Sequence, residues 1–211
     1  RALAEGPDIV AAGYLGWYER NGAEVPHPWV DCGDFLAQQL GECDSSHYSA
    51  YLFRRGFLAE IRHRPEFAFR DDRMFVIECA LRQPSVLAFD RPTLIHRHHD
   101  RGRIQFQRGS VAVVTNWQER QMWQKVIALL TGHGLLTPRR AKAMSTNLWE
   151  LATRTGAYNL TEARAILAML TRLDPDFRPS FAGRDRLYRV LGFPMAQRVV
   201  NLLRWLRDRL R

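Results

Sequence analysis

The spacing of hydrophobic residues changes about half-way along the chain. Before a boundary between residues 103 and 110, apolar residues form short runs that Gly, Pro, Asn and Asp interrupt, which is typical of strands and short helices. After it, they recur every three or four positions. This spacing predicts helices over residues 110–131, 138–155, 160–173, 184–191 and 194–210. The pattern therefore predicts an α/β part over residues 1–108 and an all-helical part over 109–211.

The α/β part contains several candidate strands and two short helices. We expect helices over residues 34–40 and 55–61, and the Asn21-Gly22 pair indicates a hairpin. The segment 67–69 is also strand-like. Strands are predicted near residues 9–18, 48–53, 86–89 and 93–97.

Two adjacent acidic residues, Asp71 and Asp72, open a helix that is apolar on nearly every side, which is typical of a buried helix. Asp is a preferred N-cap, and a carboxylate is stabilised by the positive end of the helix dipole. Two neighbouring carboxylates do not easily point the same way. One can therefore cap the helix while the other faces a cleft and takes a proton from an attacking hydroxyl.

A second polar cluster lies at the end of the last predicted strand. In a strand, His96 and His98 share one face, while Arg97 and His99 share the other. His98 or His99 could supply an imidazole ligand to a divalent metal, and Arg97 and Arg101 could hold diphosphate oxygens bidentately beside His96. No Cys or Glu-x-x-His partner completes a closed metal site, so a solvated basic loop remains an alternative.

Composition narrows the class of protein. Of 211 residues, 46% are hydrophobic and 25% are charged, which is the balance of a soluble globular protein. The net charge of +9 suits nucleic acid, an anionic membrane surface or phosphorylated ligands without choosing among them.

Cys32, Cys43 and Cys79 have no metal-type spacing, which favours free thiols in a reducing, cytoplasmic compartment. Because the chain begins with Arg1 and shows no signal peptide, we expect a fragment or a processed form.

The order of these pieces resembles the second half of a family 2 glycosyltransferase with the GT-A fold. Asp71 stands where the family usually has Glu, and His96 stands where it usually has Tyr. The residues that carry the resemblance are Pro7-Asp8-Ile9-Val10, Tyr51-Leu52-Phe53-Arg54-Arg55-Gly56-Phe57-Leu58, Asp71-Asp72-Arg73-Met74-Phe75, His96-Arg97 and Gly102-Arg103-Ile104.

The resemblance implies a partial GT-A mixed sheet, with Asp72 as catalytic base and Asp71 as the acidic residue before it. It implies transfer of a sugar, with inversion, from a nucleotide-diphospho-sugar to a saccharide or lipid-linked acceptor, in bacterial surface polysaccharide or glycoconjugate synthesis. It also implies a divalent metal, Mg²⁺ or Mn²⁺, and a place in the cytoplasm or at the inner face of the membrane.

The donor-binding half of such an enzyme is not visible in this sequence. There is no Asp-x-Asp motif followed by a Pro-containing helix start, and no βαβ unit for a nucleotide. We therefore expect these residues upstream of Arg1, and the chain to be inactive alone, with an exposed apolar face. The absence of a Gln-x-x-Arg-Trp motif favours a single-addition enzyme over a polymer synthase.

The last predicted helix is amphipathic. Arginines occupy its polar side and its edges, and its apolar face consists of Met195, Val199, Leu202, Leu203, Leu206 and Leu210. We expect this face to dock on the protein's own helices. The alternative is an anionic membrane surface, where lipid-linked acceptors reside.

Two other functions compete with sugar transfer. One is a metal-dependent hydrolase built from Asp71, Asp72, His96, His98 and His99, which would have to converge on one ion. The other is a basic helical module that binds nucleic acid. It ranks last because the sequence has no recognisable reading motif and no aromatic-rich basic sheet.

Overall fold

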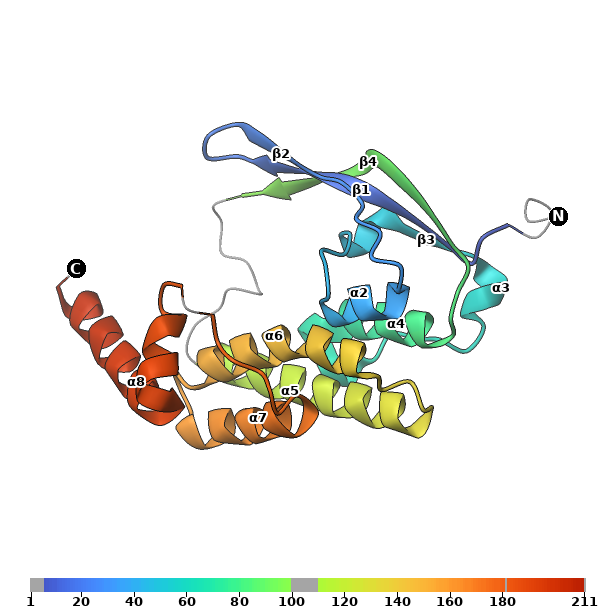
Figure 1. Cartoon of the computed structure of the whole chain (residues 1–211). Coiled ribbons are helices and arrows are strands. Elements are labelled where there is room, and N and C mark those ends of the chain that lie inside the picture. Colours follow the sequence, from blue (N-terminus) through green and yellow to red (C-terminus); the bar gives the residue numbers. More distant parts are fainter. Residues whose placement is uncertain (1–5, 100–109, 181, 211) are drawn as a thin grey trace.

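A small mixed sheet precedes an all-helical region in the computed structural model, which describes residues 6–99, 110–180 and 182–210 (Figure 1). The prediction of an α/β part followed by helices is confirmed at this level. The four strands are β1 (Ile9–Tyr18), β2 (Ala23–His27), β3 (Tyr51–Phe53) and β4 (Val86–His98).

Strand β1 is the centre of the sheet. Its second half pairs antiparallel with β2, placing Tyr14 opposite His27, and its first half pairs antiparallel with β3. On its other side β1 pairs in parallel with β4 from Ile9 to Tyr18, with register shifts on both sides of Gly13. The two strands predicted over 86–89 and 93–97 are thus one irregular strand. Parallel pairing brings the His96–His98 end of β4 beside the end of β1.

Short helical elements connect the strands: α2 (Phe35–Leu40), η1 (Tyr48–Ala50), α3 (Arg55–Leu58), η2 (Pro65–Arg70) and α4 (Asp71–Leu81). The strand expected over 48–53 is limited to its last three residues, and the helix expected over 55–61 ends at Leu58. The strand expected at 67–69 is wrong, because these residues belong to the 3₁₀ helix η2. Pro65 stands at the start of η2, where its fixed φ favours a helical turn.

The helical region contains α5 (Ser110–Gly132), α6 (Pro138–Thr155), α7 (Leu160–Leu173) and α8 (Asp185–Arg209). Side-chain caps set two starts: Thr137 accepts a hydrogen bond from the Arg140 N–H, and Asn159 accepts one from the Glu162 N–H. The two helices expected over 184–191 and 194–210 are joined in α8 across a kink at Gly192, with φ 70° and ψ 162°.

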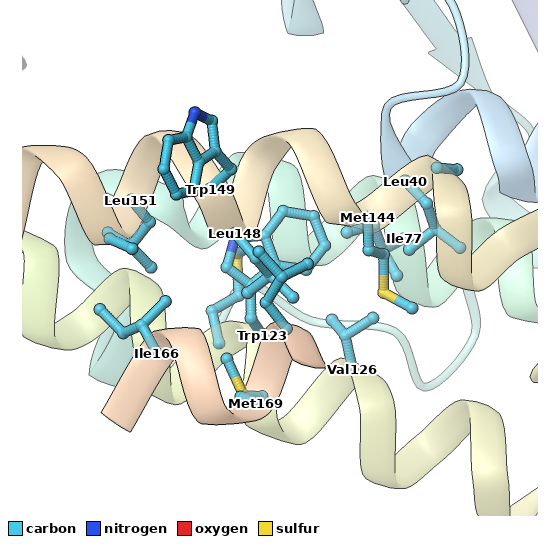
Figure 2. Close-up of a cluster of buried hydrophobic side chains, with 14 of the residues drawn as sticks. Leu40, Ile77, Trp123, Val126, Met144, Leu148, Trp149, Leu151, Ile166 and Met169 are labelled. Carbon is cyan, nitrogen blue, oxygen red and sulfur yellow. The ribbon is translucent and has the colours of Figure 1, made fainter. Parts of the chain in front are cut away.

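Two hydrophobic cores meet at α4. The larger one lies between α2, α4 and the helices α5 to α8, where Trp123, Leu148 and Ile77 are almost fully buried (Figure 2). The smaller one joins Ile9 and Phe75 under the sheet. Because α4 contributes to both, it is apolar on nearly every side, as its sequence predicts. The larger core also runs across residue 108, where the sequence suggests a division.

The sheet is covered by helices on one side (Figure 1). Several of its large apolar side chains are exposed: Leu52, Leu87, Phe89 and Ile95. Among the described residues, no helix is both long and apolar enough to cross a membrane.

Candidate functional site

The acidic pair occupies the first turn of α4, where the positive end of the helix dipole stabilises carboxylates. The Asp71 carboxylate accepts a hydrogen bond from the Asp72 backbone N–H at 2.7 Å and contacts His63 Nδ1 at 3.1 Å. The Asp72 carboxylate accepts a hydrogen bond from the Arg73 N–H at 2.6 Å. The contacts of the two carboxylates thus differ, because only the Asp71 carboxylate contacts His63. The expectation that one of the two acids caps the helix is wrong, because the N-cap position of α4 is Arg70 and no side chain caps this end.

A cluster of aromatic and imidazole rings gathers where β1, β2 and β4 run side by side. We call it the His–Tyr cluster, and it consists of Tyr14, Tyr18, His27, His47, His96 and His98. His27 stacks on Tyr14 with ring centroids 4.4 Å apart, and His98 stacks on Tyr18 at 4.3 Å. His96 lies 4.5 Å from His98 and 4.3 Å from His47. Rings from three strands and one loop therefore form one continuous surface.

Gly16 makes space for this cluster. It is paired with His96 in β4, between the stacked tyrosines of β1. A Cβ atom at Gly16 would lie 3.3 Å from His27 Nε2 and 3.4 Å from His98 Nε2. Any larger residue would push these imidazoles apart, so the absence of a side chain keeps the cluster closed.

Asp72 and the cluster are linked electrostatically through His47. Burial lowers the pKa of His47 below its usual value, and the negative charge of Asp72 acts in the opposite direction. Burial also raises the pKa of Tyr14, and the nearby Asp44 carboxylate adds to this increase. His47 is therefore neutral at pH 7. The Asp72 carboxylate at the start of α4 thus acts on one imidazole of the His–Tyr cluster, that of His47.

Arg97 lies apart from the cluster. Its guanidinium stacks over the Trp17 ring at 5.2 Å and donates to Glu19 at 2.8 Å. Trp17 alternates with Gly16 and Tyr18 along β1, so Arg97 is on the opposite face of the sheet from His96. These two predicted diphosphate ligands do not converge, and Arg101 and the Gly102–Ile104 segment lie outside the described residues.

The predicted metal ligands do not form a complete site within the described part of the chain. His98 is in the cluster, and His99 follows the end of β4 with its Nδ1 buried. In residues 6–99, 110–180 and 182–210, no group of three or more His, Cys, Asp or Glu side chains could hold a metal ion. These residues alone therefore do not fit Mg²⁺ or Mn²⁺, and the mechanism proposed below uses no metal-dependent step.

The turn that carries the acidic pair is anchored to the helical region. Arg73 is buried against the Trp123 ring at 5.4 Å and donates to the Gln39 carbonyl at 3.2 Å. Burial lowers the pKa of Arg73, and the Glu119 carboxylate opposes this effect. Glu119 also pairs with Arg70 at 2.8 Å, on the other side of the acidic pair. The first turn of α4 is thus fixed from both sides by basic residues.

Several residues of this site were not predicted, namely Tyr14, Tyr18, His27, His47 and His63. Tyr14 and Tyr18 have the alternate spacing of one strand face, and the hairpin places His27 opposite Tyr14. This signal is present in the sequence. His47 and His63 lie in connections between elements, and nothing in the local pattern indicates that they approach the acidic pair.

The chain matches no known protein-family model, no curated protein and no solved structure.

Proposed function

We propose that this chain forms the acceptor side of an inverting glycosyltransferase that uses a nucleotide-diphospho-sugar donor. The observation that carries the proposal is the placement of Asp72. It stands in the first turn of a buried helix, and its charge acts on His47 in the ring surface at the end of β4. An acidic pair and a polar strand end, separated by more than twenty residues in the sequence, thereby share one region.

In the proposed reaction, Asp72 is the general base. An acceptor hydroxyl gives its proton to the Asp72 carboxylate while its oxygen forms a bond to the anomeric carbon of the donor sugar. The bond from that carbon to the diphosphate oxygen breaks, and its electron pair leaves with the nucleoside diphosphate. Attack from the side opposite the leaving group inverts the anomeric configuration.

The remaining residues of the region have supporting roles in this proposal. Asp71 is occupied by His63 and by the Asp72 backbone N–H, so it positions the turn. The imidazoles and tyrosines of the His–Tyr cluster are suited to sugar recognition, because aromatic faces pack against sugar C–H groups and ring nitrogens hydrogen-bond hydroxyls. A divalent metal and the donor-binding residues are expected from other parts of the enzyme.

The competing hydrolase has no observation in its favour. It requires Asp71, Asp72, His96, His98 and His99 to converge on one ion, and the described residues contain no such group.

The test is a donor screen on the full-length protein. Nucleotide-diphospho-sugars would be incubated with candidate saccharide and lipid-linked acceptors, and release of nucleoside diphosphate would be measured together with the glycosylated product. We expect one donor to give equal amounts of both, with inverted anomeric configuration by NMR. Release without any glycosylated acceptor, or a product with retained configuration, would overturn the proposal.

A further inference from the structure

Helix α8 packs on the larger core through a face that combines apolar residues, such as Phe193 and Ala196, with polar ones. After the kink at Gly192, Phe193 and Gln197 are buried, and Gln197 accepts a hydrogen bond from the Tyr188 hydroxyl at 2.6 Å. One turn later, the Asn201 side chain donates to the Gly156 carbonyl at 3.0 Å. This close approach requires a glycine, since a Cβ at Gly156 would lie 2.8 Å from the Gln197 amide carbon. These contacts fix the rotation of the helix about its axis.

The apolar stripe of α8 consequently points away from the protein. Val199, in the middle of the predicted apolar face, is half-buried. The other five residues of that face are exposed by 54, 56, 58, 41 and 87%: Met195, Leu202, Leu203, Leu206 and Leu210, respectively. The prediction that this face docks on the protein's own helices is therefore wrong. The opposite face lies against the α6–α7 turn instead, where Asn201 donates to the Gly156 carbonyl, and Gln197 orients Asn201 by donating to its side-chain oxygen at 2.9 Å.

Basic residues border the exposed stripe. Arg198 and Arg209 lie along one edge and Arg207 along the other, while Asp208 is the only acidic residue between Gly192 and Leu210. Trp205 is 48% exposed and lies under the Arg209 guanidinium at 4.1 Å. Long arginine side chains reach anionic groups while their stems cover apolar surface, and tryptophan favours the boundary between water and lipid.

We propose that the second half of α8 lies in the plane of an anionic lipid surface. The leucine stripe enters the boundary between headgroups and acyl chains, and the arginines at its edges contact lipid phosphates. The arginines indicate that the stripe contacts lipid and not the same stripe of a second copy of this chain. Pairing two such stripes would bring rows of arginines together, whereas an anionic surface neutralises them. The inference does not depend on the proposed sugar transfer.

The test is co-sedimentation of the 211-residue chain with phosphatidylcholine vesicles that contain phosphatidylglycerol, compared with pure phosphatidylcholine. Leu202→Ser combined with Leu206→Ser should reduce binding by at least about tenfold, since two exposed leucines lose their lipid contact. Arg207→Gln combined with Arg209→Gln should weaken binding by about fivefold for each arginine at low ionic strength. Both effects should leave the melting temperature unchanged, because the altered side chains are exposed.

Matched controls alter the same residue types elsewhere. Leu52→Ser with Ile95→Ser replaces two large aliphatic side chains that are exposed on the sheet, and is the control for the leucine variant. Arg20→Gln with Arg55→Gln removes two positive charges elsewhere, and is the control for the arginine variant. These controls should bind vesicles as the parent chain does. Equal binding to neutral and anionic vesicles, or unchanged binding of the Leu202 and Leu206 variant, would overturn the proposal. So would sedimentation of the parent chain as a dimer that this variant converts to monomer.

Discussion

The helical region and the sheet bury their apolar side chains to very different extents. In the helical region, α4 to α7 enclose a continuous core in which Trp123, Met144 and Leu148 are almost inaccessible. In the sheet, only the side that faces α4 is closed, and Leu52 and Ile95 are 71% and 66% exposed. The core between α4 and α7 is closed, whereas the sheet has room for another layer on its open face.

This difference bears on the proposed enzyme. Parallel strand pairs are usually buried on both faces, whereas β1 and β4 have one apolar face open. A donor-binding half packed against that face would cover it. The acidic pair stands between the two regions, held by Arg73 and Glu119 on the closed side. The molecule thus combines a closed helical scaffold with a sheet face that we expect a further layer to cover.

The largest expected difference in stability compares two identical substitutions. Leu148→Ala leaves a cavity in the closed core and should lower the free energy of unfolding by about 3 kcal/mol. Leu52→Ala, on the open face of the sheet, should change it by less than about 0.5 kcal/mol. Urea unfolding of both variants measures the contrast. Equal losses would show that the sheet face is as well packed as the helical core.

The next largest effect on the free energy of unfolding is expected from the ion pairs that connect the two regions. Glu119 is paired with Arg70 at 2.8 Å and with Arg154 at 2.9 Å, and its side chain is 9% exposed. Glu119→Gln should therefore lower the free energy of unfolding by about 2 kcal/mol. Glu150→Gln, at an exposed position of α6, is the matched control and should have little effect. If Glu119→Gln leaves the free energy of unfolding unchanged, these ion pairs do not stabilise the contact between the regions.

A smaller, pH-dependent effect is expected at Asp34. Burial acts to raise the pKa of Asp34, but the Ala37 N–H and the Arg140 guanidinium, 3.0 Å away, outweigh it, so the pKa is lowered from 3.8. The contribution to stability is therefore present above pH 3.8 and is lost as the pH falls through the lower folded-state pKa. Asp34→Asn should cost about 1 kcal/mol at pH 7 and progressively less as the pH falls below 3.8.

The partner of Asp34 provides the check. In an Arg140→Gln background, Asp34→Asn should cost less at pH 7, and its pH dependence should flatten. Thermal melts of the four chains between pH 2 and pH 7 make the comparison. A cost that stays constant over this range would exclude the ion pair as its source.

The smallest expected signal is in donor binding. Calorimetric titration of the 211-residue chain with nucleotide-sugars should give no micromolar binding, since the proposed donor site lies outside these residues. Tight binding by this chain alone would contradict the assignment of the sheet to the acceptor side.

Much of the helical region could be predicted from sequence. Helices α6 and α7 have the predicted bounds, because Thr137 and Asn159 are strong caps and the apolar spacing between them is regular. The segment 67–69 was mistaken for a strand because its aromatic residues resemble one. The chain instead bends there, with Ala68 at φ 41°. A positive φ is uncommon for a residue other than glycine, so local propensity does not predict this bend.

The site could be predicted only in part. The position of Asp71 and Asp72 at the start of a buried helix followed from the sequence. The partners of these residues did not, because His47 and His63 reach them through connections whose path depends on the whole fold. The placement of His96 and Arg97 on opposite faces of the strand followed from the alternation of the sequence, and it is what keeps these two candidate diphosphate ligands apart.

The central claim is that Asp72 accepts the proton of the attacking hydroxyl, and its most direct test compares the two acids in the full-length protein. Asp72→Asn keeps the size of the side chain and removes its basicity, so turnover should fall by about 10²–10⁴-fold with little change in donor binding. Asp71→Asn should retain much more activity and mainly lower thermal stability, because it weakens the contact with His63. If turnover survives Asp72→Asn, the proposed base is wrong.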